Sequence, residues 1–228
     1  MNRRQLPTRP GPALATSSRP GRRGDAKTRA RASSKARLNQ GELRLIGGRL
    51  RGRRLPILDQ PGLRPTGDRI RETLFNWLAP IIAGSRCLDA FSGSGALGFE
   101  ALSRGAEQVV MLERNARIAR QLNANARLLS AEGLDIQQTD SLRWLASTAP
   151  TPFDIIFLDP PFAEHLLPAV LEQLSSRAWL SPAARVYVET DAREPLPELP
   201  RGWEWLREKT AGQVRFGLAL GSTRRPCR

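Results

Sequence analysis

The stretch CLDAFSGSGALGFEAL, residues 87–102, decides the fold of this 228-residue chain. Its apolar start predicts a strand that ends at Asp89, and the apolar spacing after the glycines predicts a helix. Between them, Gly93 and Gly95 would let backbone N–H groups and the helix N-terminus approach a ligand closely. With Gly98 the segment also matches the G-x-G-x-x-G pattern of dinucleotide-binding turns. A strand, a glycine turn and a helix in this order indicate a ligand-binding α/β unit.

The same alternation of strand and helix continues along the chain. Short apolar runs predict strands at 86–90, 108–112, 134–138, 154–158 and 184–189. Helical patterns separate them, at 96–104, 114–130, 141–147 and 165–177, and an earlier helix is predicted at 68–79. This alternation predicts a doubly wound α/β fold, a mostly parallel sheet with helices on both faces. Two further runs, 203–209 and 213–220, lack a helix between them and predict a terminal β-hairpin added to the sheet.

The positive charge is confined to one end of the chain. The sequence holds 36 Lys and Arg against 22 Asp and Glu, a net charge of +14. Residues 1–40 carry +10 of this excess and residues 41–54 carry the other +4. Such a one-ended excess indicates a polyanionic partner, because phosphate contacts release counterions and steer association. A solvated tail that only aids solubility is the alternative.

The basic end has two parts. Residues 1–40 are rich in Arg, Pro, Ser and Gly and have few apolar residues to bury, so we predict a disordered tail. An Arg-rich, acid-poor start also resembles an organellar transit peptide, but its prolines disfavour the amphipathic helix that such a peptide needs. Residues 41–60 hold two apolar and basic runs around Gly47-Gly48, which predicts a β-hairpin with a tight turn. Its arginines would form a basic ribbon that contacts RNA: Arg44, Arg49, Arg51, Arg53 and Arg54. An edge hairpin with solvated arginines is the alternative.

The composition excludes several classes of protein. No apolar run reaches the roughly 18 residues of a membrane-spanning helix. The N-terminal residues lack the apolar core of a secretory signal, so we do not expect them to act as one. Cys87, Cys227 and His165 are too few for a zinc site or a disulfide framework. We therefore expect a cytoplasmic protein without a bound metal and without a membrane partner.

Acidic residues at the predicted strand ends indicate which ligand the glycine turn takes. Asp89 would repel a pyrophosphate in that turn but attract a positively charged amino-acid group. Glu113 ends the next strand, where it could accept hydrogen bonds from ribose hydroxyls, and Asp140 follows the third, where it could accept from an adenine amine. S-adenosylmethionine carries these three groups and no phosphate. Helix caps or solvated loop residues are the alternative for each acid. A nicotinamide oxidoreductase remains a second class, although no Tyr-x-x-x-Lys pattern supports it.

The second chemical motif is FDIIFLDPPF, residues 153–162. Its strand runs into Asp159-Pro160-Pro161-Phe162, which should lie at the same ligand-binding edge as Asp89. The prolines hold the turn rigid and aim the Asp159 carboxylate and the Pro160 carbonyl, two acceptors that suit the two N–H donors of an exocyclic amine. Phe162 offers a face on which a base can stack. A proline turn before a capped helix is the alternative.

Taken together, the motifs resemble those of class I S-adenosylmethionine-dependent methyltransferases that modify exocyclic amines, whose signature is (Asp/Asn)-Pro-Pro-(Tyr/Phe/Trp). More closely, the chain resembles the RsmD-type family, which methylates the N2 amine of a guanine in bacterial small-subunit (16S) ribosomal RNA. The resemblance runs from about Leu43 to Leu220 and is carried by LRLIGGRLRGRRLPI, GLRPTGDRIRETLFNWL, CLDAFSGSGALGFEALSRGA, FLDPPF, VYVE and REKTAGQVRFGLAL. The tail at 1–40 is not part of the shared pattern.

The resemblance implies a seven-stranded, Rossmann-like sheet with an antiparallel last strand, within a methyltransferase domain at 61–228. It implies that S-adenosylmethionine contacts Asp89, Phe91, Gly93, Gly95, Glu113 and Asp140. It implies that the amine is bound and methylated at Asp159, Pro160, Pro161 and Phe162. We expect a monomer that acts on 16S ribosomal RNA in an assembling small subunit. Adenine N6 or protein glutamine methylation, and a non-catalytic RNA-binding module, are the alternatives.

Overall fold

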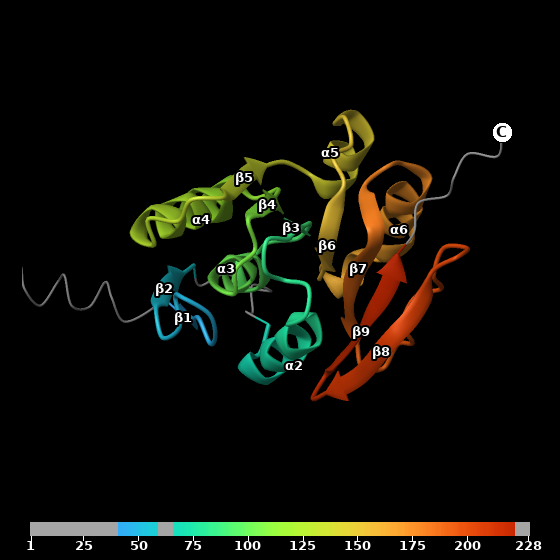
Figure 1. Cartoon of the computed structure of the whole chain (residues 1–228), viewed down its shortest axis with the longest axis horizontal. Helices are drawn as coiled ribbons and strands as arrows, with labels where there is room; N and C mark the ends of the chain where they lie inside the picture. Colours follow the sequence, from blue (N-terminus) through green and yellow to red (C-terminus); the bar gives the residue numbers. More distant parts are fainter. Residues whose placement is uncertain (1–40, 59–65, 222–228) are drawn as a thin grey trace, which may run out of the picture. The chain divides into compact units, whose positions relative to one another are not determined.

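The computed structural model of the chain describes residues 41–58 and 66–221, so the predicted tail at 1–40 lies outside the described residues. Its main element is a seven-stranded sheet of order β5-β4-β3-β6-β7-β9-β8, shown in Figure 1. The strands of this sheet are β3 (Arg86–Asp89), β4 (Gln108–Glu113), β5 (Leu134–Gln138), β6 (Phe153–Leu158), β7 (Leu180–Asp191), β8 (Glu204–Ala211) and β9 (Val214–Gly221). The helices are α2 (Asp68–Leu78), α3 (Ala96–Ser103), α4 (Ala116–Leu128), α5 (Ser141–Ser147), α6 (Leu167–Ser176) and the short 3-10 helix η1 (Phe162–Glu164).

The sheet confirms the predicted doubly wound, mostly parallel fold. Strands β5, β4, β3, β6 and β7 are parallel neighbours, whereas the last strand, β9, is antiparallel to both β7 and β8. Strands β8 and β9 form the predicted terminal hairpin, with Ala211 opposite Val214 across the turn. Within the described residues, no helix is long and apolar enough to cross a membrane.

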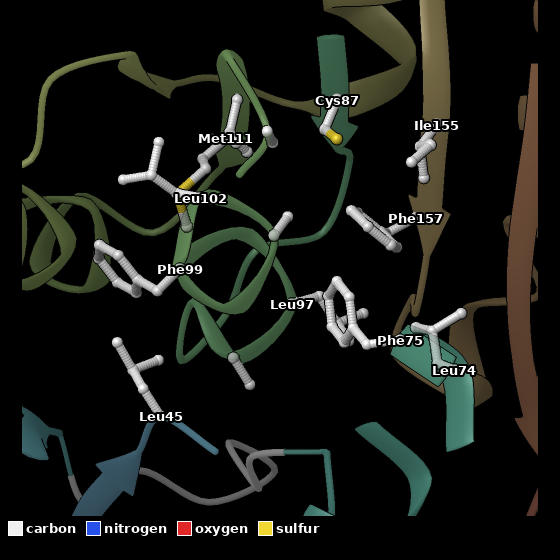
Figure 2. Close-up of a cluster of buried hydrophobic side chains, with 14 of the residues drawn as sticks. Leu45, Leu74, Phe75, Cys87, Leu97, Phe99, Leu102, Met111, Ile155 and Phe157 are labelled. Carbon is white, nitrogen blue, oxygen red and sulfur yellow. The ribbon is translucent and has the colours of Figure 1, made fainter. Parts of the chain in front are cut away.

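Side chains on the two faces of the sheet form two separate cores, because successive residues of a strand point to opposite faces. On one face Cys87 and Phe157 pack with α2, α3, α4 and the N-terminal hairpin. Figure 2 shows side chains of α2, α3 and the hairpin around them. There the rings of Phe75 and Phe157 lie 5.9 Å apart, which joins α2 to the centre of the sheet. On the other face Leu88 and Ile156 pack with α5 and α6. The helices therefore leave the carboxyl ends of the strands open between them.

The N-terminal hairpin forms, but the tight turn predicted at Gly47-Gly48 is wrong. Strands β1 (Gly41–Arg44) and β2 (Arg54–Ile57) pair antiparallel. The Leu45 N–H donates to the Arg53 carbonyl and the Gly52 N–H donates to the Leu45 carbonyl, which extends the pairing before a longer loop. The loop is set by its contact with α3. Gly48 has a φ of +72°, and a Cβ there would lie 1.8 Å from the Ser103 carbonyl oxygen. Docking against the helix therefore decides the loop, which turn propensity could not predict.

A buried ion pair fastens this hairpin to the sheet domain. Arg71 of α2 is 1% exposed and Glu100 of α3 is fully buried, with Nη1 and Oε2 3.2 Å apart. The pair is bonded to the hairpin from both sides: Arg71 donates to the Arg44 carbonyl at 2.9 Å, and the Ile46 N–H donates to Glu100 at 2.9 Å. The hairpin is thus held against α2 and α3 by buried charge-assisted hydrogen bonds.

Candidate active site

A cleft of about 730 Å³ opens at the carboxyl ends of β3, β4, β6 and β7, where an open α/β sheet binds its ligands. The structure brings together in its lining all but one of the residues predicted to contact the cofactor and the amine. These are Asp89, Phe91, Gly93, Glu113, Asp140, Asp159, Pro160, Pro161 and Phe162. The exception, Gly95, lies between the lining residues Ser94 and Ala96.

Four neighbouring strands bring a row of carboxylates to this cleft, on the same face of the sheet, and β7 brings Asp191 to the lining as well. In strand order β4-β3-β6-β7 they are Glu113, Asp89, Asp159 and Glu189. In the sheet register Met111 and Phe157 are the partners of Asp89, and Tyr187 is the partner of Phe157. Glu113, Asp159 and Glu189 each follow one of these partners by two residues, so their side chains point to the same face of the sheet as that of Asp89. These four carboxylates therefore extend along the cleft from the glycine turn, past the D-P-P-F motif, to β7.

Asp89 is an anion without a cationic partner among the described residues. It is 3% exposed, and its Oδ2 accepts the Gly98 N–H at 3.0 Å. Burial raises the pKa of Asp89 to about 7, a value that already includes a smaller raising effect of the charges of Asp159 and Glu113 and a lowering effect of backbone N–H groups. A ligand cation beside this carboxylate would favour its ionised form. The position therefore suits the ammonium group of an amino acid.

The glycine turn leads directly into α3. Gly95 caps this helix with a φ of +80°, and a Cβ there would lie 2.5 Å from the ring of Phe99. The Glu113 carboxylate holds the turn from the next strand, because it accepts the Gly93 N–H at 3.0 Å and the Asn115 N–H at 2.7 Å. Glu113 is therefore oriented towards the glycine turn before any ligand binds.

For Asp140 the helix-cap alternative is confirmed. Its side chain caps α5 by accepting the Arg143 N–H at 2.9 Å, and the same residue is exposed in the cleft lining. The cap fixes the carboxylate at the rim of the cleft. Phe91 lines the cleft and packs against the core beneath α5 and α6.

Asp159 has a partner that sequence reasoning missed. The hydroxyl of Thr66, just before α2, donates to Asp159 Oδ2 at 3.2 Å across 93 residues of sequence. Burial raises the pKa of Asp159 to about 6, and the hydrogen bond from the Thr66 hydroxyl keeps it from rising higher. The Thr66 carbonyl in turn accepts Arg71 Nε at 3.1 Å, so the buried ion pair also holds this segment. Thr66 stands in the RPTGDRIRE stretch, but nothing local in that stretch points to Asp159.

Glu189 of β7 was also missed. It is 2% exposed, and its Oε1 accepts the Tyr187 hydroxyl at 2.7 Å. Burial raises its pKa well above the ordinary range, and the charge of Asp159 raises it further. The signal that could have found Glu189 is the one that found Asp89 and Glu113, an acid near the end of an apolar strand.

The arginines of the hairpin all lie outside the cleft lining and are exposed. Arg54 forms an ion pair with Glu42 at 2.8 Å. The other four have no ion pair with a described residue: Arg44, Arg49, Arg51 and Arg53. Their charge therefore faces solvent, and contact with RNA stays a prediction.

Comparisons with known proteins agree with this geometry. The family model described as "Conserved hypothetical protein 95" matches residues 43–219. Ribosomal RNA small subunit methyltransferase D of Escherichia coli strain K12 is 47% identical over 178 residues, which cover 78% of this chain and 89% of that protein. The protein of the same name from Haemophilus influenzae is 48% identical over 182 residues, covering 78% and 94%. The solved structure of yhhF from Escherichia coli superposes with a TM-score of 0.74 at 43% identity, over 79% of this chain and 98% of that one.

An open sheet with one antiparallel strand and an acid-lined cleft at its carboxyl ends defines a class I, Rossmann-like methyltransferase fold. Within that class, the chain belongs to the RsmD-type family of methyltransferases. Because the chain belongs to this family, the alternative that it is a nicotinamide oxidoreductase is excluded.

Proposed function

We propose that the chain transfers a methyl group from S-adenosylmethionine to the N2 amine of a guanine in small-subunit (16S) ribosomal RNA. The observation that carries this proposal is the pairing, in one cleft, of a buried anion suited to a cation, Asp89, with two rigid acceptors, Asp159 and the Pro160 carbonyl. The names of the relatives supply the substrate class. We further propose that the protein acts as a cytoplasmic monomer on an assembling subunit.

The residues at the glycine end of the cleft fit the methyl donor. Asp89 would take its ammonium group, and Glu113 would accept hydrogen bonds from its ribose hydroxyls. Asp140 and Phe91 would border its adenine. When bound, S-adenosylmethionine supplies an electrophilic methyl group on a sulfonium. The remaining residues orient the nucleophile towards it. Among the described residues, no group of His, Cys, Asp and Glu is arranged to hold a metal ion.

The amine end of the cleft would act mainly through positioning and electrostatics. A guanine amine is a weak nucleophile because its lone pair is delocalised into the ring. Hydrogen bonds from the amine to Asp159 and the Pro160 carbonyl would favour a pyramidal nitrogen and localise that lone pair. Phe162 would stack on the base, which must be turned out of its helix to enter. The methylated nitrogen is cationic and loses a proton, which Asp159 can receive.

A labelling experiment tests this function. Small subunits lacking the modification would be incubated with isotopically labelled S-adenosylmethionine, digested to nucleosides and analysed by mass spectrometry. We expect labelled N2-methylguanosine. Labelled N6-methyladenosine would instead support the adenine alternative. Cofactor binding without labelled RNA would support the non-catalytic module or a protein substrate.

A matched pair of variants links the reaction to the cleft. Asp159→Ala should retain cofactor binding and lose most of the methyl transfer. Asp135→Ala removes a half-buried carboxylate outside the cleft lining and should leave transfer unchanged. Wild-type turnover in Asp159→Ala would refute the assigned role.

A further inference from the structure

Glu189 extends the acceptor set of the D-P-P-F motif onto the next strand. Phe157 and Tyr187 are register partners on β6 and β7, so Asp159 and Glu189 are the neighbouring residues one step further along the same face. Both line the cleft, and the Thr66 hydroxyl, which donates to Asp159, lies close enough to Glu189 to lower the pKa of that carboxyl as well. Two carboxylates within reach of one hydroxyl form a double acceptor.

One oxygen of Glu189 is already used, which fixes how the other can act. Oε1 accepts a hydrogen bond of 2.7 Å from the hydroxyl of Tyr187, which lies two residues earlier on the same strand and the same face of the sheet. The side chain is 2% exposed and cannot swing into solvent. Oε2 is therefore the oxygen left for a ligand that enters beside Asp159, and an N–H donor of that ligand would favour the ionised form, in which Oε2 accepts.

The bases differ in what lies next to their exocyclic amine. In guanine the N2 amine is adjacent to N1–H, so two neighbouring positions donate hydrogen bonds. In adenine and cytosine the amine is adjacent to a ring nitrogen that accepts. A second acceptor beside Asp159 therefore favours guanine, because it would face an unpaired lone pair on either of the other bases.

We propose that Glu189 is a specificity-determining residue that accepts the N1–H of the target guanine while Asp159 and the Pro160 carbonyl accept its N2 amine. The inference rests on the proposed function and adds the reason for guanine. Tyr187 is a positioning residue in this arrangement, because its hydroxyl holds Glu189 Oε1 away from the base.

The test compares two bases that share the reacting amine. Small subunits would be reconstituted from RNA carrying either guanine or 2-aminopurine at the methylated position. 2-Aminopurine keeps the N2 amine but has an accepting N1. The wild type should prefer guanine by about 100-fold in kcat/KM, the scale of a lost hydrogen bond to a charged group. Equal rates on the two bases would overturn the inference without any variant.

The variant Glu189→Gln then replaces the accepting Oε2 atom by an amide N–H₂ group, which donates. The Tyr187 hydroxyl should hold the amide oxygen, which turns the amide N–H₂ towards N1. We expect the preference for guanine to fall by about 10-fold or more, through slower guanine and faster 2-aminopurine methylation. Glu189→Asp keeps a carboxylate and should keep the preference, even if both rates fall. Cofactor binding by each variant serves as the control for folding.

The outcomes separate this inference from the proposed function. Equal losses on both bases in Glu189→Gln would make Glu189 a structural residue and overturn the inference alone. No N2-methylguanosine from the wild type would overturn the proposed function and the inference with it.

Discussion

Replacing Arg71 by Met should cost a large part of the protein's stability. Arg71 is 1% exposed, and its guanidinium donates to Glu100, to Asp68 and to the carbonyls of Thr66 and Arg44. A methionine fills much of the space but makes none of these hydrogen bonds. The Glu100 carboxylate, fully buried, then loses its closest buried counter-charge.

The contacts that remain set the magnitude. Removing one partner of a buried pair typically costs about 3 to 5 kcal/mol, because the other charge stays desolvated. Glu100 keeps Arg104 Nε at 2.8 Å and the Ile46 N–H at 2.9 Å, so the lower value applies. We expect a loss of about 3 kcal/mol in the free energy of unfolding.

Equilibrium unfolding in urea, followed by tryptophan fluorescence, measures this loss. With a slope of about 2 kcal/mol per molar, the midpoint should fall by about 1.5 M. Arg54→Met is the matched control, because Arg54 and Glu42 form an exposed ion pair and such pairs contribute little. Its midpoint should be that of the wild type.

A double-mutant cycle decides whether the buried charge is the cause. Glu100→Gln in the Arg71→Met background removes the carboxylate that has lost Arg71, so the double variant should lose less than the sum of the two single losses. A coupling below about 0.5 kcal/mol would mean independent sites and refute the reasoning. So would a midpoint of Arg71→Met equal to that of the control.

The site yields three more expected results. Methyl transfer should decline as the pH falls through about 6, the raised pKa of Asp159, because the protonated carboxyl accepts less well from the amine. Thr66→Val removes a hydroxyl that stabilises the carboxylate and should move this decline to higher pH; Thr66→Ser should leave it in place, and equal profiles would remove Thr66 from the mechanism. Asp89→Ala should weaken S-adenosylmethionine binding at least about 10-fold by calorimetry, since a charge-assisted contact is lost; wild-type affinity would contradict the cation site. Gln at both Arg51 and Arg53 should reduce the salt dependence of RNA affinity, the slope of log K on log salt, by about 1.5, with cofactor affinity unchanged; an unchanged slope would place the RNA elsewhere.

The elements that bear the cleft could be predicted because their signals are local. Apolar runs, helical spacing and the glycines after Asp89 are properties of neighbouring residues. Parallel strands end at one edge of a sheet, so the acids and the D-P-P-F motif could be assigned to one cleft before any contact was known. Asp89, Glu113 and Asp159 all line it as expected.

The partners of those residues depend on contacts between distant segments. Thr66 meets Asp159 across 93 residues, and Arg71 meets Glu100 across 29. The conformation of the hairpin loop is set by its contact with Ser103 of α3 and not by the turn preference of Gly47-Gly48. Glu189 becomes part of the site only because β7 pairs in register with β6. Local sequence specifies which residues end each strand, whereas the packing of strands and helices specifies which distant groups become their hydrogen-bond and ion-pair partners.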